Sequence, residues 1–213
     1  MNVADVRTEF RRLLSVGEYT DGRGGRTVEI VGASFTADEP SVFGELNTSF
    51  VERELAWYAS QSLNIADFVD APTLWKRCAA PDGSVNSNYG WCVYSEANGC
   101  QFDWVLGALR EDAGTRRAQA IYTRPSMHFD AVVGGRNDFM CTNAVLYLLR
   151  RGRLDAVVQM RSSDAVFGYR NDLVWQRRVL EHLASELGTE PGRITWQAGS
   201  LHVYERHWPL IVG

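Results

Sequence analysis

The residues most able to do chemistry lie in the C-terminal half of this chain. Cys141 carries a thiol, whose thiolate form is a strong nucleophile. Arg161 begins an Arg-Ser-x-Asp segment that ends at Asp164, and the fork of a guanidinium suits a phosphate group. His202 and Tyr204 form a His-x-Tyr segment. Together these groups could attack an electrophilic carbon of a ligand and bind an anionic part of it.

The composition favours one globular domain. The chain has 213 residues, of which 45% are hydrophobic, so it can bury one core, and we expect a single domain over residues 1–213. The net charge of −4 argues against sequence-independent nucleic-acid binding, which requires clustered basic residues. A small anion held by a few arginines is compatible with this charge.

The cysteines and the N-terminus indicate a reduced, cytoplasmic, soluble protein. The four cysteines form no CxxC pair and have no nearby histidine in the sequence, which predicts neither a metal site nor a disulfide framework. The first residues lack the basic and apolar regions of a signal peptide. No run approaches the roughly 18 apolar residues that a membrane span needs.

Hydrophobic periodicity predicts helices and strands in alternation. We expect helices over about 3–14, 50–58, 102–109 and 172–187, and strands over 27–31, 118–122, 144–149, 154–160 and 194–204. A glycine-rich loop spans 21–26. Helices interleaved with the strands of one sheet predict the α/β or α+β class.

The motifs and their order along the chain resemble the thymidylate synthase superfamily, and within it the phage-type nucleotide hydroxymethylases. The resemblance covers nearly the whole chain and is strongest after residue 140. It implies a large mixed sheet flanked by helices, a homodimer, a pyrimidine nucleoside monophosphate as substrate and 5,10-methylenetetrahydrofolate as co-substrate.

The resemblance assigns the nucleophile and the phosphate-binding strand. A cysteine met without context is more often a buried core residue. In the family, however, the matching cysteine attacks the pyrimidine, so Cys141 is expected to be the nucleophile. The residues that match Arg161 and Ser162 bind the nucleotide phosphate, and the one that matches Asp164 lies between the pyrimidine and the folate. These three could otherwise form a solvated strand end.

Further arginines match the family's phosphate-binding residues. Arg23, in the glycine loop, resembles a mobile phosphate-binding arginine, and Arg26 is its rival because the loop length differs from that of the synthases. Arg116 and Arg117 resemble twin arginines that reach the phosphate of the partner subunit. Paired arginines before a strand are otherwise more often surface charge.

Residues in the first half of the chain match the pyrimidine and folate sites. Glu54, on a predicted amphipathic helix, resembles a glutamate that organises water and protons around the base, whereas most such glutamates face solvent. Trp75 resembles a tryptophan that stacks on folate. Tyr89 matches a tyrosine near the cysteine, and Asn64 lies in a segment that is also like the family.

Asp172 is the residue expected to read the base. The synthases have an asparagine four residues after the glycine that matches Gly168, and its amide suits uracil. A carboxylate accepts from an amino group and repels a carbonyl, so Asp172 suits cytosine. His202 and Tyr204 match the pair that holds the sugar hydroxyl.

The expected reaction converts dCMP and water to 5-hydroxymethyl-dCMP. Hydroxymethyl is expected over methyl because the synthases' long C-terminal closing segment is missing from this sequence. The alternatives are a thymidylate synthase or hydroxymethylase that acts on dUMP, a CMP hydroxymethylase, and a nucleotide-binding subunit without activity. The chain also departs from the synthases around the cysteine, with Met140 in place of a proline and Thr142 in place of a histidine.

Overall fold

The computed structural model describes residues 1–22 and 24–213, which form two compact units. Unit 1 comprises Met1–Leu46 and Tyr147–Gly213, and unit 2 comprises Asn47–Leu146. A single catalytic domain over residues 1–213 stays a prediction.

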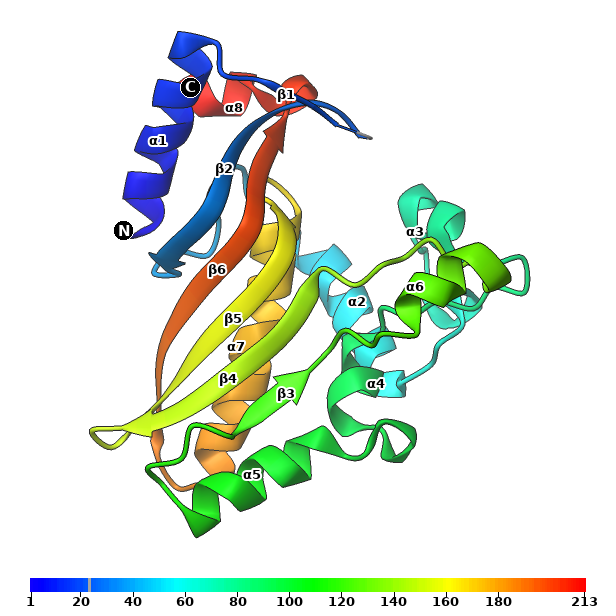
Figure 1. The fold of residues 1–213 in the computed structure, drawn as a ribbon, viewed down its shortest axis with the longest axis vertical. Helices are drawn as coiled ribbons and strands as arrows, with labels where there is room; N and C mark the ends of the chain where they lie inside the picture. The colour runs from blue at the N-terminus through cyan, green and yellow to red at the C-terminus, as the bar shows by residue number, and fades with distance from the viewer. Residues whose placement is uncertain (23) are drawn as a thin grey trace. The chain divides into compact units, whose positions relative to one another are not determined.

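Unit 1 is built on the strands around β6 (Glu190–Tyr204). On one side β6 pairs antiparallel with β2 (Gly25–Thr36), and on the other it pairs parallel with β5 (Arg153–Asp164). Helix α7 (Gly168–Glu186) packs against β5 and β6 (Figure 1). The remaining elements are α1 (Val3–Val16), β1 (Thr20–Gly22), the end of β4, a 3-10 turn (Glu205–His207) and α8 (Pro209–Val212).

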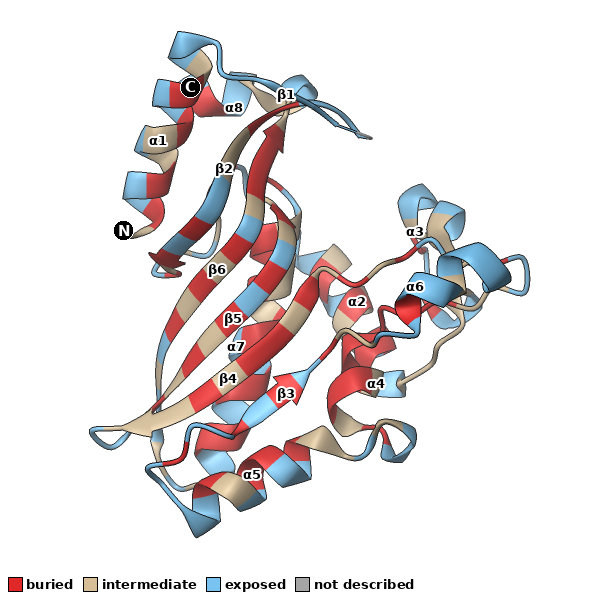
Figure 2. Ribbon diagram, viewed as in Figure 1, coloured by how far each residue is buried: buried red, intermediate tan, exposed pale blue. Residues whose placement is uncertain are grey.

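The strands of unit 1 have one buried face. Buried residues alternate with less buried ones along β5 and β6 (Figure 2), as expected where one face of a sheet packs on a helix. Trp196 of β6 is fully buried and meets the ring of Tyr169 of α7 edge to face, with 5.1 Å between centroids. The core of unit 1 therefore lies between α7 and the sheet.

Helix α1 forms where the sequence predicts it. Asn2 and Asp5 make a reciprocal capping box at its start. The helix stops at Gly17, which adopts a left-handed conformation with φ 72°. Its buried residues, which include Val6 and Phe10, recur at helical spacing and pack against β2.

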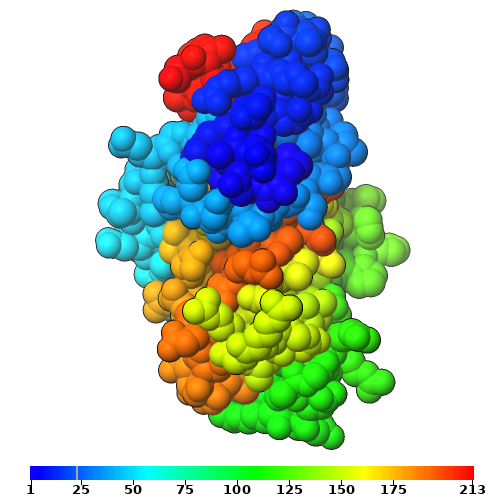
Figure 3. Space-filling view, turned by 90° about the vertical axis from the view of Figure 1, so that its left-hand side faces the viewer, coloured from blue at the N-terminus to red at the C-terminus, as the bar shows by residue number. Residues whose placement is uncertain are grey.

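The C-terminal residues lie beside α1, as the adjoining red and blue atoms of Figure 3 show. Arg11 Nε donates to the carbonyl of Ile211 at 3.1 Å. The ring of Trp208 stacks on that of Tyr19, with 4.7 Å between centroids, and its Nε1 donates to the carbonyl of Val203 at 3.2 Å. The tail is thus attached to unit 1.

Helix α7 begins earlier than the sequence predicted. Its first residue is Gly168, whereas we expected a start at Asp172. The N-cap position is occupied by Phe167, which makes no side-chain capping bond, so the true start carries no capping signal. Asp172, where we expected the helix to begin, lies in its second turn.

Four strands, β2, β4, β5 and β6, are also longer than expected. Strand β2 continues to Thr36, and β6 begins at Glu190 although Pro191 and Gly192 follow it. These two residues normally indicate a turn. Proline is tolerated near the strand end, where the pairing with β5 shifts register.

Unit 2 is mainly helical. Its elements are α2 (Thr48–Ser60), a 3-10 turn (Ile65–Asp67), α3 (Thr73–Cys78), α4 (Tyr89–Tyr94), a 3-10 turn (Glu96–Asn98), α5 (Gln101–Glu111), β3 (Gln119–Ile121), α6 (Met127–Phe129), a π-helical turn (Asp130–Gly134) and the start of β4 (Thr142–Arg150). Strand β3 pairs antiparallel with this start of β4. The core is aromatic: Trp57 stacks on Phe68 at 5.0 Å, and Tyr58 stacks on Tyr89 at 5.2 Å.

The strands are ordered β1-β2-β6-β5-β4-β3. The sheet is mixed, because β5 pairs parallel with β6 whereas β1 with β2, β2 with β6 and β3 with β4 pair antiparallel. The expected fold class, a mixed sheet with flanking helices, is confirmed.

Candidate active site

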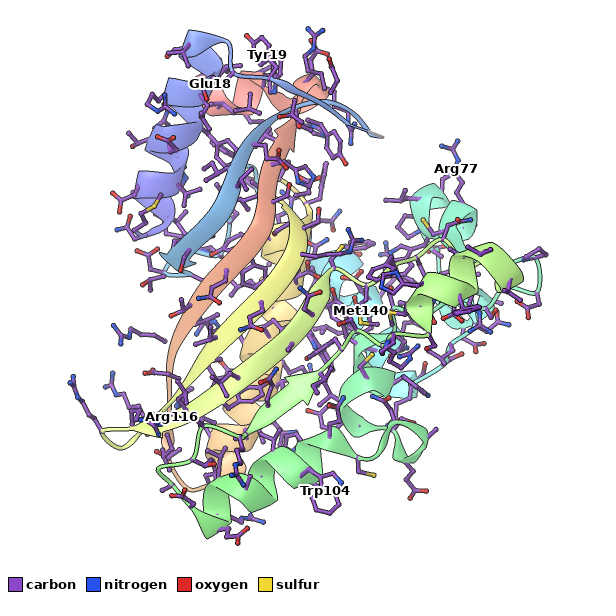
Figure 4. All side chains as sticks on the ribbon, viewed as in Figure 1. Glu18, Tyr19, Arg77, Trp104, Arg116 and Met140 are labelled. Atoms are coloured by element: carbon purple, nitrogen blue, oxygen red, sulfur yellow. The ribbon has the colours of Figure 1, made fainter. Side chains whose placement is uncertain are left out.

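The expected nucleophile lies in unit 2, where the chain enters β4. Cys141 is half-buried between Met140 and Thr142, which are both fully buried (Figure 4 labels Met140). Thr142 Oγ1 is hydrogen-bonded to the Tyr89 hydroxyl at 3.0 Å, in the interior of the unit. Two buried neighbours and this hydrogen bond fix the backbone around Cys141, and Tyr89 lies close to it as expected.

A buried carboxylate holds the segment that precedes Cys141. Asp138 Oδ2 accepts from the backbone N–H groups of Asn86 and Ser87, the latter at 2.8 Å. Ser87 Oγ also donates to the carbonyl of Asp138 at 3.1 Å. Burial raises the pKa of Asp138 above its ordinary value, although these hydrogen bonds act in the opposite direction. Asp138 therefore ties the nucleophile segment to residues 86–87.

Asn88 and Gly90 join residues 86–90 to helix α2. Asn88 Nδ2 donates to the carbonyls of Trp57 and Ser62, at 2.8 and 2.9 Å. A Cβ on Gly90 would overlap the carbonyl oxygen of Tyr58, so only glycine fits there. This close approach explains why Tyr89 is followed by glycine.

Glu54 and Trp75 also lie in unit 2. The Glu54 side chain is buried on α2, with 7% of its surface exposed, although most glutamates on an amphipathic helix face solvent. Trp75 of α3 is half-buried and meets the ring of Trp57 edge to face, with 5.2 Å between centroids. Trp75 therefore belongs to the aromatic cluster of unit 2 and is partly exposed to solvent.

Arg116 and Arg117 are both exposed, in the segment that leads from α5 to β3 (Figure 4 labels Arg116). The backbone N–H of Arg117 donates to Thr115 Oγ1 at 3.2 Å. Asn64, by contrast, has a structural role, because its Oδ1 accepts from the backbone N–H of Ala66 at 2.9 Å.

The other expected site residues lie in unit 1, and strand register brings several of them together. Asp164 of β5 and Glu29 of β2 are both paired with His202, at the centre of three adjacent strands. Ser162 pairs in the same way with Ser200. Asp164 and Ser162 are half-buried, whereas Arg161 is exposed.

His202 is the most buried of these candidates, with 9% of its surface exposed. Burial lowers its pKa, while the carboxylates of Asp164 and Glu29 act to raise it. The ring of Tyr204 meets that of His202 edge to face, with 5.0 Å between centroids. The expected His-x-Tyr pair therefore forms one aromatic cluster, in which the histidine favours its neutral form.

Gly168 is the point where two expected acidic residues come close together. A Cβ built on Gly168 would lie 3.4 Å from Asp164 Cβ and 3.9 Å from Asp172 Oδ2. Asp172 is half-buried. Its neighbour Asn171 has a buried Oδ1 without a hydrogen-bond partner among the residues described. The first turns of α7 thus present polar groups next to the end of β5.

The glycine loop lies against Tyr204. A Cβ on Gly24 would lie 2.6 Å from the Tyr204 ring, so glycine permits this approach. Arg26 is engaged with two carboxylates, Asp21 at 3.3 Å and Glu205 at 3.9 Å. Arg23, the favoured phosphate ligand, lies outside the residues described.

The structure also bears on metals and on membranes. Over residues 1–22 and 24–213, no three His, Cys, Asp or Glu side chains are grouped so that they could hold a metal ion. Within the same ranges, no helix has the length and apolar character needed to cross a bilayer.

The sequence pointed to neither Asp138 nor the pair Glu29 and Ser200. Asp138 is separated from Ser87 by 51 positions, and Ser200 from Glu29 by 171. The one available signal was Glu29 itself, an acidic residue in an otherwise apolar strand segment.

Similarity to known proteins extends over nearly the whole chain. The thymidylate synthase family model matches residues 10–212. Deoxycytidylate 5-hydroxymethyltransferase of Enterobacteria phage T4 is 46% identical over 220 residues, which cover 99% of this chain and 89% of the phage protein; the phage T2 protein gives the same values. Thymidylate synthase of Fusobacterium nucleatum is 25% identical over 206 residues, 92% of this chain and 73% of that enzyme. The chain therefore belongs to the thymidylate synthase family.

Proposed function

We propose that this protein transfers a one-carbon unit from 5,10-methylenetetrahydrofolate to C5 of dCMP, and that with water it forms 5-hydroxymethyl-dCMP and tetrahydrofolate. The observation that carries the proposal is the 46% identity to phage deoxycytidylate 5-hydroxymethyltransferase over 99% of the chain. A match of this extent covers both the cysteine segment of unit 2 and the strand segments of unit 1.

Cys141 begins the reaction. Its thiolate adds to C6 of the cytosine ring, which makes C5 nucleophilic. C5 then bonds to the one-carbon unit, loses its proton and retains an exocyclic methylene as tetrahydrofolate departs. Water adds to that methylene, and the C6–S bond breaks to restore the ring and the thiolate. The rigid backbone around Cys141 supports this role, because attack requires a fixed approach to C6.

Asp172 reads the base. Its carboxylate accepts from the N4 amino group of cytosine and repels O4 of uracil, a difference of about 1–3 kcal/mol. Its proximity to Gly168 and Asp164 supports the role, because both belong to the same group of family motifs. His202 and Tyr204 hold the sugar hydroxyl.

Arginines bind the nucleotide phosphate. Arg161 and Ser162 act from β5, and Arg23 acts from the glycine loop. Arg26 is less suited because Asp21 and Glu205 already balance its charge. In a homodimer, Arg116 and Arg117 bind the phosphate of the partner subunit; their exposure on the monomer supports this role.

The folate is contacted by Trp75 and Asp164, and Glu54 and Tyr89 act near the base. Burial of Glu54 supports a role with ordered water, because a carboxylate inside an apolar helix face needs polar partners. In this role Glu54 orients the water that adds to the methylene.

The test is to identify the products. The enzyme is incubated with methylenetetrahydrofolate and dCMP, CMP or dUMP, product mass is determined, and absorbance of dihydrofolate is followed. We expect hydroxymethyl-dCMP without dihydrofolate. Dihydrofolate formed in step with a methylated nucleotide would instead indicate a methylating synthase, and product from dUMP or CMP alone would indicate a different nucleotide.

A nucleotide-binding subunit without activity is excluded by a covalent complex. Incubation with 5-fluoro-dCMP and methylenetetrahydrofolate should give a species heavier than the chain by both ligands, attached at Cys141. If no adduct forms while dCMP still binds, the protein is a binding subunit.

A further inference from the structure

A hydrogen-bonded chain of three side chains connects β2 to β6 in unit 1. Ser200 Oγ donates to Glu29 Oε1, and the same Oγ lies 3.3 Å from His202 Nδ1. Ser200 and His202 are two residues apart on β6, so their side chains point to the same face, and Glu29 is paired directly with His202. The three side chains therefore meet through regular strand register.

The number of hydrogens that Glu29, Ser200 and His202 share fixes the direction of each hydrogen bond between them. A serine hydroxyl has one hydrogen, and an ionised carboxylate can only accept. Because Ser200 gives its hydrogen to Glu29, it can only accept from His202. Nδ1 of His202 must therefore carry a hydrogen, and in a neutral ring Nε2 then has a free lone pair.

The surroundings of His202 agree with a neutral ring that is protonated at Nδ1. Burial lowers its pKa, so the imidazolium is disfavoured, although Asp164 and Glu29 lie on either side. A hydrogen bond with the backbone of Ser200 acts to raise the pKa. Arg161 acts in the same direction as burial.

We propose that Glu29, acting through Ser200, is a positioning residue that holds His202 in the tautomer whose Nε2 accepts a hydrogen bond. His202 then selects a ligand group that donates, which for a nucleotide is the 3′-hydroxyl of the sugar. The second step rests on the proposed function, in which His202 holds the sugar hydroxyl. Neither Glu29 nor Ser200 touches the nucleotide in this arrangement.

The first experiment determines the tautomer without any ligand. Nitrogen-15 NMR of the imidazole rings distinguishes a protonated from an unprotonated nitrogen, and the signals of His202 are identified by their loss in His202→Gln. We expect Nδ1 protonated and Nε2 unprotonated in the native protein, and a mixture of tautomers in Ser200→Ala. A native ring protonated at Nε2 alone would overturn the proposal, whatever the protein catalyses.

The second experiment tests whether the hydrogen bonds among Glu29, Ser200 and His202 affect binding of the sugar hydroxyl. Binding of dCMP and of 2′,3′-dideoxycytidine monophosphate is compared in the native protein, Ser200→Ala and Glu29→Ala, because alanine, unlike glutamine, leaves no oxygen to accept from Ser200. Loss of one neutral hydrogen bond should weaken dCMP binding about five- to tenfold, and binding of the dideoxy ligand less than twofold. Equal losses for both ligands would show a general structural role and overturn the proposal.

One double variant and two control variants test the result further. If Glu29 acts only through Ser200, the double variant should bind dCMP no more weakly than Ser200→Ala alone. Ser34→Ala on β2 and Glu190→Ala on β6 are matched controls with exposed side chains, and both should bind like the native protein. If the native protein binds neither nucleotide, the proposed function fails together with the second step, while the NMR result still decides the first.

Discussion

In unit 1, Asp164 and His202 are aligned because β5 and β6 pair in register, whereas in unit 2 the segment before Cys141 is held by the side chain of Asp138. Strand register rests on many backbone hydrogen bonds, so one substitution removes a contact without moving the frame. A loop held by a few side chains has no such redundancy. Substitutions in unit 2 should therefore alter stability or the chemical step, and those in unit 1 should alter ligand preference.

The largest effect is expected at the nucleophile of unit 2. Cys141→Ser should reduce kcat by at least about a thousandfold, because a hydroxyl is a far weaker nucleophile at neutral pH. Binding of dCMP, measured by calorimetry, should be nearly unchanged. Cys100→Ser, at another half-buried cysteine, should retain activity. Residual activity above a tenth in Cys141→Ser would remove this residue from the mechanism.

The next effect tests how tightly the loop of unit 2 is packed. Gly90→Ala should lower the free energy of unfolding by about 3 kcal/mol, because the new Cβ would meet the carbonyl of Tyr58. Gly107→Ala is the matched control, since a Cβ there meets nothing within 4 Å and alanine favours the helix. Chemical denaturation measures both. Equal stabilities would show that α4 can shift away from α2 at little cost.

In unit 1 the expected effect is a change in nucleotide preference. Asp172→Asn should move the ratio of kcat/KM for dCMP over dUMP toward dUMP by about 10- to 100-fold, because an amide can donate to O4. The free energy of unfolding should change little. Glu181→Gln, at an exposed position on the same helix, should leave the ratio unaltered. A ratio that does not move in Asp172→Asn would assign base reading to another residue.

A smaller effect is expected at the exposed arginines of unit 2. Arg116→Ala and Arg117→Ala should each weaken dCMP binding about three- to tenfold, through loss of one charged contact to phosphate. Arg178→Ala, at an exposed position on α7, is the control. Mixing either variant with Cys141→Ser under conditions of subunit exchange should restore activity, because a mixed dimer has one complete site. No recovery on mixing would contradict the cross-subunit role.

The smallest effect concerns the pH dependence of stability. Burial raises the pKa of Asp138 in the folded protein above 3.8, so its contribution to stability is fully present below about pH 3.8 and is lost as pH rises through the folded pKa. Asn cannot titrate, but its oxygen can still accept from residues 86 and 87. The native protein should therefore gain stability relative to Asp138→Asn as the pH falls from 7 to 4. Parallel stability curves over that range would mean that Asp138 does not titrate there.

Much of the secondary structure of unit 1 could be predicted from local sequence. The capping residues and glycine stop of α1 are adjacent to the helix they bound, and the apolar alternation of β5 and β6 appears directly as buried faces. The start of α7 was wrong because Phe167 gives no capping signal. The chemistry of the site was expected from the resemblance of the motifs to the thymidylate synthase family, because a thiol, a guanidinium and an imidazole by themselves fit many reactions.

What the sequence by itself determined was the class of fold, the family motifs and the list of candidate groups. Only the tertiary structure decided which contacts position these groups. They are the hydrogen bonds of Asp138 to residues 86 and 87, the close approach of Gly90 to Tyr58, and the contact of Glu29 with His202 through Ser200. The physical reason is the range of the interactions. Helix caps and alternation act between near neighbours, whereas the contacts of Asp138, Gly90 and Glu29 join residues from 32 to 171 positions apart and exist only once the strands and loops have packed.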